Sequence, residues 1–172
     1  MIAVLSDTHS EDGHVLAGRA AAAVADADEV LHAGDFTTET ALDGFHDAAD
    51  RLHAVHGNAD APGVRNRLPA ARTVEVAGIR VALTHRRDGG EMGLSMFGRE
   101  RGADLVVSGH THAPTVKETE DVVLLNPGSH ADPRGATPAH AEVEQGGRGM
   151  AIELWTPGGT LVTERSLSER GR

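Results

Sequence analysis

The sequence predicts an α/β sandwich with mixed sheets, and three observations support this fold class. Short apolar strands alternate with segments suited to helices in the N-terminal part of the chain. The remainder is rich in strands, several of which are joined by tight turns. Polar residues directly follow five of the apolar strands, which is typical of sheets that bind a ligand at the carboxyl ends of their strands.

The N-terminal units share one layout, in which an apolar strand runs into a polar cluster. Thr37 or Thr38 is suited to cap the second helix, because a hydroxyl can accept from the free N–H groups of a first turn. The segments are "IAVL" at 2–5 before "SDTHS", a helix over 14–25, "EVLHAGD" at 29–35, a helix over 38–50, and "LHAVHGNAD" at 52–60.

The rest of the chain favours hairpins. Two strands in "RTVEVAGIRVALTH" meet at Ala77-Gly78, a typical hairpin turn. The later segments are a helix over 91–101, the strand of "ADLVVSGHTH", a second hairpin in "PTVKETEDVVLLNPGS", and three tail strands over 140–167 with turns at 146–147 and 158–159. No repeat or linker interrupts them, so we expect residues 1–172 to form one domain.

Composition excludes several kinds of site. The chain has no cysteine, which excludes disulfides, thiolate zinc sites and cysteine nucleophiles. It lacks the run of about 18 apolar residues that a membrane span requires, and "MIAVLSDTHS" is too short and polar for a signal peptide. We therefore expect a soluble, cytoplasmic protein without a membrane partner.

The charge balance is acidic. The chain has 26 acidic and 16 basic residues, a net charge of −10, and Lys117 as its one lysine. This charge argues against binding extended nucleic acid, because phosphates would be repelled over most of the surface. An acidic, lysine-poor composition suits a halophile, although high genomic GC content would also favour arginine over lysine. Eleven histidines are a first indication of metal chemistry.

The polar strand ends together suggest a metal site. In a strand, residues at i and i+2 share a face, so Asp7 and His9 are predicted to converge. Carboxylate with imidazole suits Mn, Fe, Ni or Zn better than Ca or Mg. Each residue alone is explained as well by a cap, a turn or a surface position, but the ordered set is not. The set is Asp7, His9, Asp35, Asn58, His85, His110 and His112.

Seven candidate ligands exceed the roughly four that one zinc ion takes. Two ions that share a carboxylate would use them all, and two ions roughly 3.5–4 Å apart can bind a phosphoryl group between them. Asp35, in the middle of the set, is the natural bridge.

The same residues resemble the motifs of the calcineurin-like metallophosphoesterase superfamily. The matching blocks occur in the family's order and span roughly residues 2–165. With "LLNPGS" at 124–129 and "PRG" at 133–135, the chain is similar to the small bacterial and archaeal phosphodiesterase branch. The blocks are "SDTH" at 6–9, "AGDF" at 33–36, "GNAD" at 57–60, "LTH" at 83–85 and "SGHTH" at 108–112.

This resemblance implies a four-layer αββα sandwich with two mixed central sheets. It implies that Asp7, His9 and His112 hold one metal ion and that Asp35 bridges to a second. Asn58, His85 and His110 would hold that second ion. A metal-bridging hydroxide would be the nucleophile, with manganese the leading metal and nickel, zinc or iron as alternatives.

The chain departs from the family at two positions. Many members have a histidine that protonates the leaving group where this chain has Ala59, so no side-chain general acid is expected there. The ligand His85 is usually followed by glycine, whereas here Arg86 and Arg87 follow. Arg86, Asn58 and His130, which follows "NPGS", are candidates for binding substrate, and a solvent-facing arginine pair is equally compatible with the sequence.

Three functions are compatible with these residues. The leading one is hydrolysis of a small phosphodiester, and the second is hydrolysis of a phosphomonoester such as a nucleotide or small metabolite. The third is a non-catalytic scaffold, as in the retromer coat, where the metal ligands are altered. The intact ligand set argues against a scaffold. The apolar strands of the tail could form the interface of a homo-oligomer.

Overall fold

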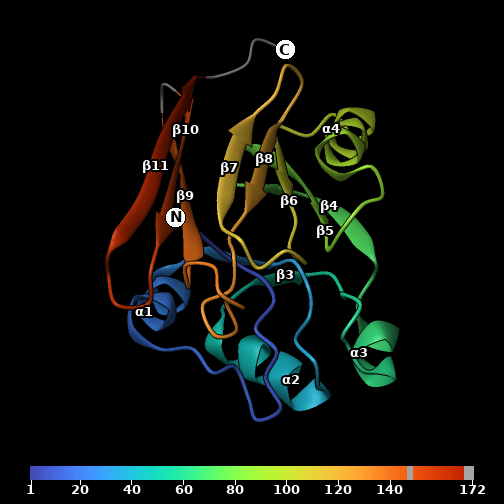
Figure 1. Ribbon diagram of the computed structural model, residues 1–172, viewed down its shortest axis with the longest axis vertical. Coiled ribbons are helices and arrows are strands. Elements are labelled where there is room, and N and C mark those ends of the chain that lie inside the picture. Colours follow the sequence, from blue (N-terminus) through green and yellow to red (C-terminus); the bar gives the residue numbers. More distant parts are fainter. Residues whose placement is uncertain (147–148, 169–172) are drawn as a thin grey trace.

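The computed structural model describes residues 1–146 and 149–168, and its strands form two mixed sheets (Figure 1). The first sheet has the strand order β11-β10-β9-β1-β2-β3. Its strands are β1 (Ile2–Leu5), β2 (Glu29–His32), β3 (Leu52–Ala54), β9 (His140–Gly146), β10 (Gly149–Trp155) and β11 (Leu161–Ser168). Strands β1, β2 and β3 are parallel, whereas β9, β10 and β11 add antiparallel pairs.

The second sheet has the order β4-β5-β6-β8-β7. It consists of β4 (Ala71–Val76), β5 (Ile79–Thr84), β6 (Leu105–Val107), β7 (Thr115–Glu118) and β8 (Val123–Asn126). Strands β5, β6 and β8 are parallel, and the hairpins β4–β5 and β7–β8 add the antiparallel edges. Both predicted hairpins and the mixed character of the sheets are confirmed.

Helices cover the outer faces of the sheets. In Figure 1, α1 (Gly18–Asp26) and α2 (Glu39–Ala48) flank the first sheet, and α4 (Gly90–Glu100) flanks the second. In β1, Ile2 and Val4 pack between the two sheets, whereas Ala3 and Leu5 pack under the helices. Strands β5, β6 and β8 alternate in the same way. This period-2 alternation produces the four predicted layers, αββα.

Two details differ from the predicted elements. Helix α1 begins at Gly18 rather than at residue 14, because Val15 (φ 46°) adopts left-handed backbone that a helix excludes. The connection after residue 60 contains an unexpected short helix, α3 (Pro62–Arg67), with proline in its first turn. Thr38 caps α2, as predicted, by accepting from the N–H of Ala41.

The remaining expectations concern the tail and the membrane. The turn at Gly158-Gly159 joins β10 to β11, whereas residue 147 of the other predicted turn lies outside the described residues. Among the described helices, none has the length and apolar character needed to cross a bilayer.

Candidate metal centre

The predicted ligands lie in loops that follow the parallel strands of both sheets. Backbone hydrogen bonds join these loops in pairs. The N–H of Asp7 donates to the carbonyl of Gly34 (2.9 Å), and the N–H of His9 donates to that of Asp35 (3.0 Å). The N–H of Gly109 donates to the carbonyl of His85 (2.9 Å), which links the loops after β6 and β5. The positions of the ligands are thus fixed by main-chain pairing.

The prediction that Asp7 and His9 converge because they share one face of a strand is wrong in its physical reason. Strand β1 ends at Leu5, so neither residue has the extended backbone that would place them on one face. Instead, five of the seven candidates adopt left-handed backbone, which costs of order 1–3 kcal/mol for each residue other than glycine. Their φ angles are 54° (Asp7), 43° (His9), 61° (Asp35), 73° (His110) and 59° (His112).

Two glycines allow the carboxylates to approach the backbone. A Cβ on Gly57 would lie 2.1 Å from Oδ1 of Asp35, and one on Gly109 would lie 2.5 Å from Oδ2 of Asp7. Both distances are far inside van der Waals contact, so the "GN" and "SGH" motifs require glycine at these positions.

Asp7, His9 and His112 form a first group that could hold a metal ion, since their ligand atoms lie within 4.8 Å of one another. The Asp7 side chain is fully buried, and its Oδ1 lies 3.4 Å from Nε2 of His112. The hydroxyl of Ser6 donates to its Oδ2 (2.7 Å), and the N–H of His110 donates to both oxygens (3.1 and 2.9 Å).

Asp7, Asp35 and His85 form a second such group. Oδ2 of Asp35 lies 3.3 Å from Nε2 of His85 and 3.5 Å from Nε2 of His9. Its Oδ1 accepts from the N–H of Ala59 (2.7 Å). Asp7 therefore belongs to both groups, and Asp35 faces a histidine of each.

Two histidines are oriented by backbone carbonyls. Nδ1 of His85 donates to the carbonyl of Ala33 (2.8 Å), and Nδ1 of His112 donates to that of Asp132. Each bond fixes the proton on Nδ1 and directs Nε2 toward the carboxylates. This is how metal-binding histidines are usually held, because the unprotonated nitrogen must face the ion.

The carboxylates also shift the pKa values of their neighbours. Burial works to lower the pKa of His85, but Asp35 and then Asp7 outweigh it, so the pKa is raised. Burial likewise works to raise the pKa of Asp35. The hydrogen bond from His85, the charge of His85 and the N–H of Ala59 outweigh burial, so the pKa of Asp35 is lowered. Because a proton and a metal ion compete for Nε2 of His85, acid opposes metal binding here.

Asp60 stabilises the loops that carry the candidate ligands. Its carboxylate is buried and accepts from the N–H groups of Asp35 (3.0 Å), Thr37 (2.7 Å) and Gly57 (2.7 Å). This one side chain therefore ties the loop after β2 to the loop after β3. Arg65 of α3 donates to the carbonyls of Asp60 and Asn58, which holds the same loop from its outer side.

Asn58 and His110 lie at the exposed side of the centre. Oδ1 of Asn58 is 3.2 Å from Nε2 of His85, which places the amide oxygen beside the second group. The His110 ring lies edge-on to His85, with 5.4 Å between ring centroids, and belongs to neither group. Burial and then the charge of His85 lower its pKa.

The predicted substrate contacts differ in position. Arg86 is exposed at the side of the centre, and Arg87 lies over the ring of Phe97. His130 is buried, and within the described part of the chain neither of its ring nitrogens has a hydrogen-bond partner. It belongs to neither metal-binding group.

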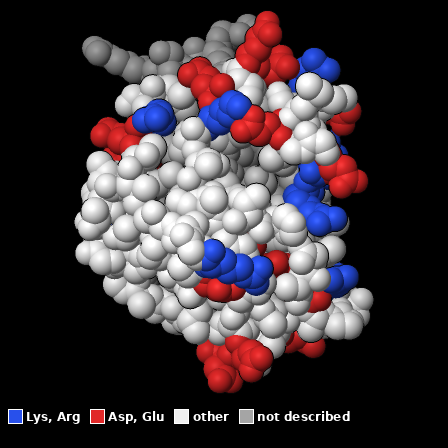
Figure 2. All heavy atoms as spheres, in the orientation of Figure 1, with Lys and Arg blue, Asp and Glu red and all other residues white. Residues whose placement is uncertain are grey.

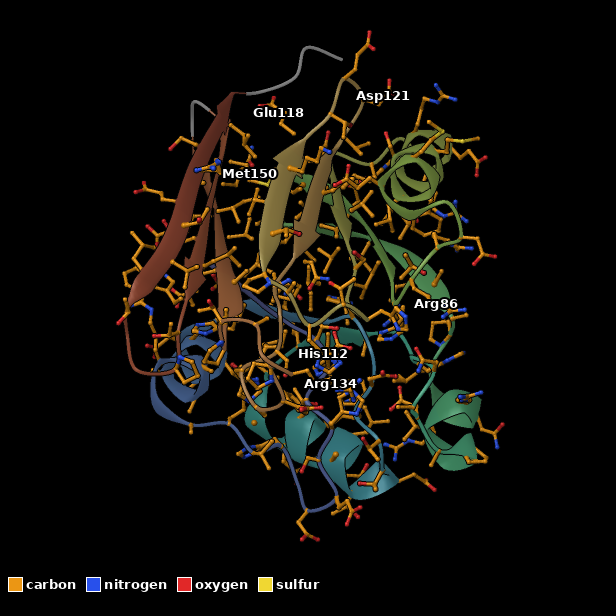
Figure 3. All side chains as sticks on the ribbon, in the orientation of Figure 1. Arg86, His112, Glu118, Asp121, Arg134 and Met150 are labelled. Carbon is orange, nitrogen blue, oxygen red and sulfur yellow. The ribbon has the colours of Figure 1, made fainter. Side chains whose placement is uncertain are left out.

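Sequence analysis did not assign three residues of the segment 129–134 that contact the centre. The hydroxyl of Ser129 donates to the carbonyl of Asp7 (2.6 Å). Arg134 pairs with Asp132 and places Nη2 3.3 Å from Nε2 of His9, and Figure 3 shows Arg134 beside His112. The motifs "NPGS" and "PRG" contain Ser129 and Arg134, but nothing in their spacing indicates the contacts.

The donor set fits divalent metal ions. Among the described residues, neither Asp7 nor Asp35 forms an ion pair with a lysine or arginine; the partners of both are histidines. Two buried carboxylates within 4.8 Å of each other repel, and a cation between them removes that cost. Imidazole nitrogens that already face the same space complete a site of the kind that binds transition metals.

Comparison with known proteins gives a consistent family relationship. Residues 1–146 match the family model described as "Calcineurin-like phosphoesterase superfamily domain". A protein named "Probable metallophosphoesterase" from Methanothermobacter thermautotrophicus is 35% identical over an alignment of 175 positions that covers 99% of each chain. A protein named as a phosphodiesterase from Methanocaldococcus jannaschii is 25% identical over 138 residues, 74% of this chain and 82% of its own.

Solved structures share the fold at lower identity. Vps29 from Cryptosporidium parvum superposes with a TM-score of 0.82 at 18% identity, covering 98% of this chain and 97% of its own. Vps29 from Entamoeba histolytica, solved in complex with zinc, superposes with a TM-score of 0.77 at 20% identity, and the alignment covers 97% of this chain and 98% of its own.

Replacing Gly109 tests whether close packing shapes the centre. In Gly109→Ala the new Cβ would lie 1.9 Å from Oγ of Ser6, so the Asp7 carboxylate must move. We expect the affinity for Mn²⁺ to fall by about 10–100-fold, as for other changes that displace a ligand. Isothermal titration calorimetry measures this. Gly158→Ala, whose Cβ meets no atom closer than 3.8 Å, is the matched control, and equal affinities in both variants would contradict the prediction.

His130 predicts a pH dependence of stability. Burial lowers its pKa from 6.5 to about 4. Between these values the unfolded chain binds a proton that the folded chain does not, so the free energy of unfolding falls as pH drops from 6.5 to 4. The loss is about 3 kcal/mol.

Urea denaturation across this pH range, with EDTA present, measures the effect. His130→Leu removes the titrating group, so its stability is expected to depend less steeply on pH than that of the native chain. His46→Gln, at an exposed position of α2, is the control with the native slope. A native slope in His130→Leu would show that His130 is not the group responsible.

Proposed function

The chain belongs to the calcineurin-like phosphoesterase superfamily, and on that premise we propose that it hydrolyses phosphodiesters with the help of two divalent metal ions. The observation that carries this proposal is the overlap of two metal-binding groups through the buried carboxylate of Asp7. A single ion would not need two groups of ligands, whereas two adjacent ions use both.

The proposed ligands combine these two groups with the neighbouring side chains of Asn58 and His110. Asp7, His9 and His112 would hold the first ion, in agreement with the first group. Asp35 would bridge, since its Oδ2 faces His9 on one side and His85 on the other. Asn58, His85 and His110 would hold the second ion; manganese is the leading candidate, with nickel, zinc and iron as alternatives.

When bound, such ions supply an activated water for attack at phosphorus and positive charge for the phosphoryl oxygens. The protein's own residues do the rest. His85 and His112 are held in the tautomer that presents Nε2, and Asp60 keeps the loops of Asp35 and Asn58 in register. Asn58, which is exposed beside His85, is positioned to donate its amide N–H to a substrate oxygen.

The preference for diesters rests on two supports. The relative from Methanocaldococcus jannaschii is named as a phosphodiesterase. In addition, Ala59 provides no side chain that could protonate a leaving group, and a diester with a good leaving group has least need of one. A small substrate, rather than an extended nucleic acid, is in keeping with the net charge of −10.

The proposal is tested by hydrolysis of bis-p-nitrophenyl phosphate and p-nitrophenyl phosphate with Mn²⁺, Ni²⁺, Zn²⁺ or Mg²⁺, at low and at multimolar salt. Metal-dependent hydrolysis that favours the diester is expected. A preference for the monoester would establish a phosphomonoesterase instead. Absence of turnover together with absence of metal binding would leave the scaffold function.

Asp35→Asn tests the bridging role directly. The amide oxygen can still accept from the N–H of Ala59, so the loop keeps its main hydrogen bond while the negative charge is lost. We expect kcat to fall by at least about 100-fold, with fewer than two ions bound. Metal content measured by mass spectrometry accompanies the rate. Asp43→Asn, an exposed carboxylate of α2, is the control, and native activity of Asp35→Asn would refute the bridge.

Ala59→His tests the missing general acid. The position is exposed, so an imidazole can be accommodated without disturbing the N–H bond to Asp35. General acids contribute about 10²–10⁴-fold to rates, so the variant should hydrolyse alkyl diesters about tenfold or more faster. Bis-p-nitrophenyl phosphate, whose leaving group needs no proton, should gain little. Equal gains for both ester types would contradict this role.

A further inference from the structure

A cavity of about 540 Å³ opens directly beside the candidate metal centre. His85 and His110 line its inner end, so it adjoins the second proposed ion. Leu94, Leu124 and Leu125 contribute an aliphatic surface to its wall. A volume of this size lies within the range of small-molecule sites, about 300–1,000 Å³, and is far larger than a phosphoryl group alone requires.

The cavity is locally cationic on an acidic protein. Three basic side chains line it, Arg86, Arg87 and Lys117, against two acidic ones, Asp88 and Glu91. The chain as a whole has a net charge of −10. In Figure 2 basic side chains appear on the right flank of the face shown, where Figure 3 labels Arg86.

Arg86 differs from the other basic residues of this cavity in its lack of a partner among the described residues. Lys117 pairs with Glu91, and the guanidinium of Arg87 lies 4.1 Å from the centre of the Phe97 ring. Across residues 1–146 and 149–168, no hydrogen bond or ion pair satisfies the Arg86 side chain.

We propose that this cavity is a second substrate subsite, which binds an organic group of nucleoside size carrying a further phosphate, and that Arg86 binds that phosphate. The inference rests on the proposed phosphodiesterase function, because it places the scissile phosphate at the metal centre. The aliphatic wall suits the body of the organic group. A guanidinium suits a phosphate because its planar N–H groups can donate two parallel bonds to the oxygens.

The position of Arg86 makes the two phosphate sites neighbours. Arg86 directly follows His85 in the chain. Its side chain and the candidate ligands His85 and His110 line the same cavity. A ligand with one phosphate at the centre and its organic group in the cavity would bring a second phosphate within reach of Arg86. Among diesters with the same leaving group, the preferred substrate is therefore the one whose nucleoside-sized group carries a further phosphate.

Two matched dinucleotides test this preference with the Mn²⁺-loaded enzyme. Thymidylyl-thymidine with a 5′-phosphate differs from thymidylyl-thymidine only in the second phosphate. Hydrogen bonds to charged groups are stronger than neutral ones, so the 5′-phosphorylated substrate should show about tenfold or greater kcat/KM, through a lower KM. Arg86→Gln should abolish this preference. Arg165→Gln, an exposed position on β11, should retain it.

A binding measurement separates recognition from turnover. Calorimetry should show thymidine 3′,5′-bisphosphate binding about tenfold more tightly than thymidine 5′-monophosphate, and equal binding of the two by Arg86→Gln. Thr115→Trp, on the exposed face of β7 within the cavity lining, should weaken both ligands by filling the space. Native binding by Thr115→Trp would place the ligands elsewhere and overturn the proposal.

The outcomes distinguish this inference from the proposed function. If bis-p-nitrophenyl phosphate is hydrolysed but the second phosphate brings no gain in rate or binding, the subsite is refuted and the phosphodiesterase remains. If no ester is hydrolysed with any metal, the proposed function fails. Calorimetry of the two thymidine phosphates then tests the phosphate-binding subsite independently of hydrolysis. A difference in affinity that depends on Arg86 supports the subsite, and equal affinities refute it.

Discussion

The close approach of two buried carboxylates is the constraint on which the rest of the structure depends. Asp7 and Asp35 are almost inaccessible to solvent and belong to one group of ligand atoms within 4.8 Å of one another. Their mutual repulsion opposes folding unless other groups compensate for it. Backbone N–H groups and the Ser6 hydroxyl provide part of the compensation, and the histidines face the remaining oxygens. This arrangement is incomplete without a cation, which links the fold to metal chemistry.

The two-sheet sandwich is what makes such a site possible. Asp7 and Asp35 come from loops of the first sheet, whereas His85 and His112 come from loops of the second. A core cluster of apolar residues, drawn from β1 and β2 on one side and from β5, β6 and β8 on the other, holds the two layers face to face. Hydrogen bonds between the loops above this core then hold the ligands at fixed distances from one another. The candidate centre is thus a product of both sheets together, and neither sheet could form it alone.

Sequence analysis predicted the fold class because hydrophobic periodicity and tight-turn residues report on local structure and burial. It also identified strand ends as the place where the ligands would gather. It could not predict the left-handed backbone of Asp7 or His9, since non-glycine residues adopt it only when tertiary hydrogen bonds enforce it. It missed α3 because six residues beginning at a proline show little periodicity. The burial of His130, and the lack of a partner for Arg86 within the described part of the chain, depend on neighbours distant in sequence, so no local pattern reveals them.

The left-handed residues have a consequence for selectivity among metal ions. Five candidate ligands are anchored on left-handed backbone, so a loop that changed conformation to suit an ion of different size would have to leave a conformation that its tertiary contacts impose. Adjustment is left to side-chain rotation and to Asn58, which is exposed and is not one of these five residues. An ion that demands a wide or oxygen-rich shell must therefore draw ligands from water or substrate. The backbone conformation that folding imposes on these loops therefore bears on which ion suits the centre.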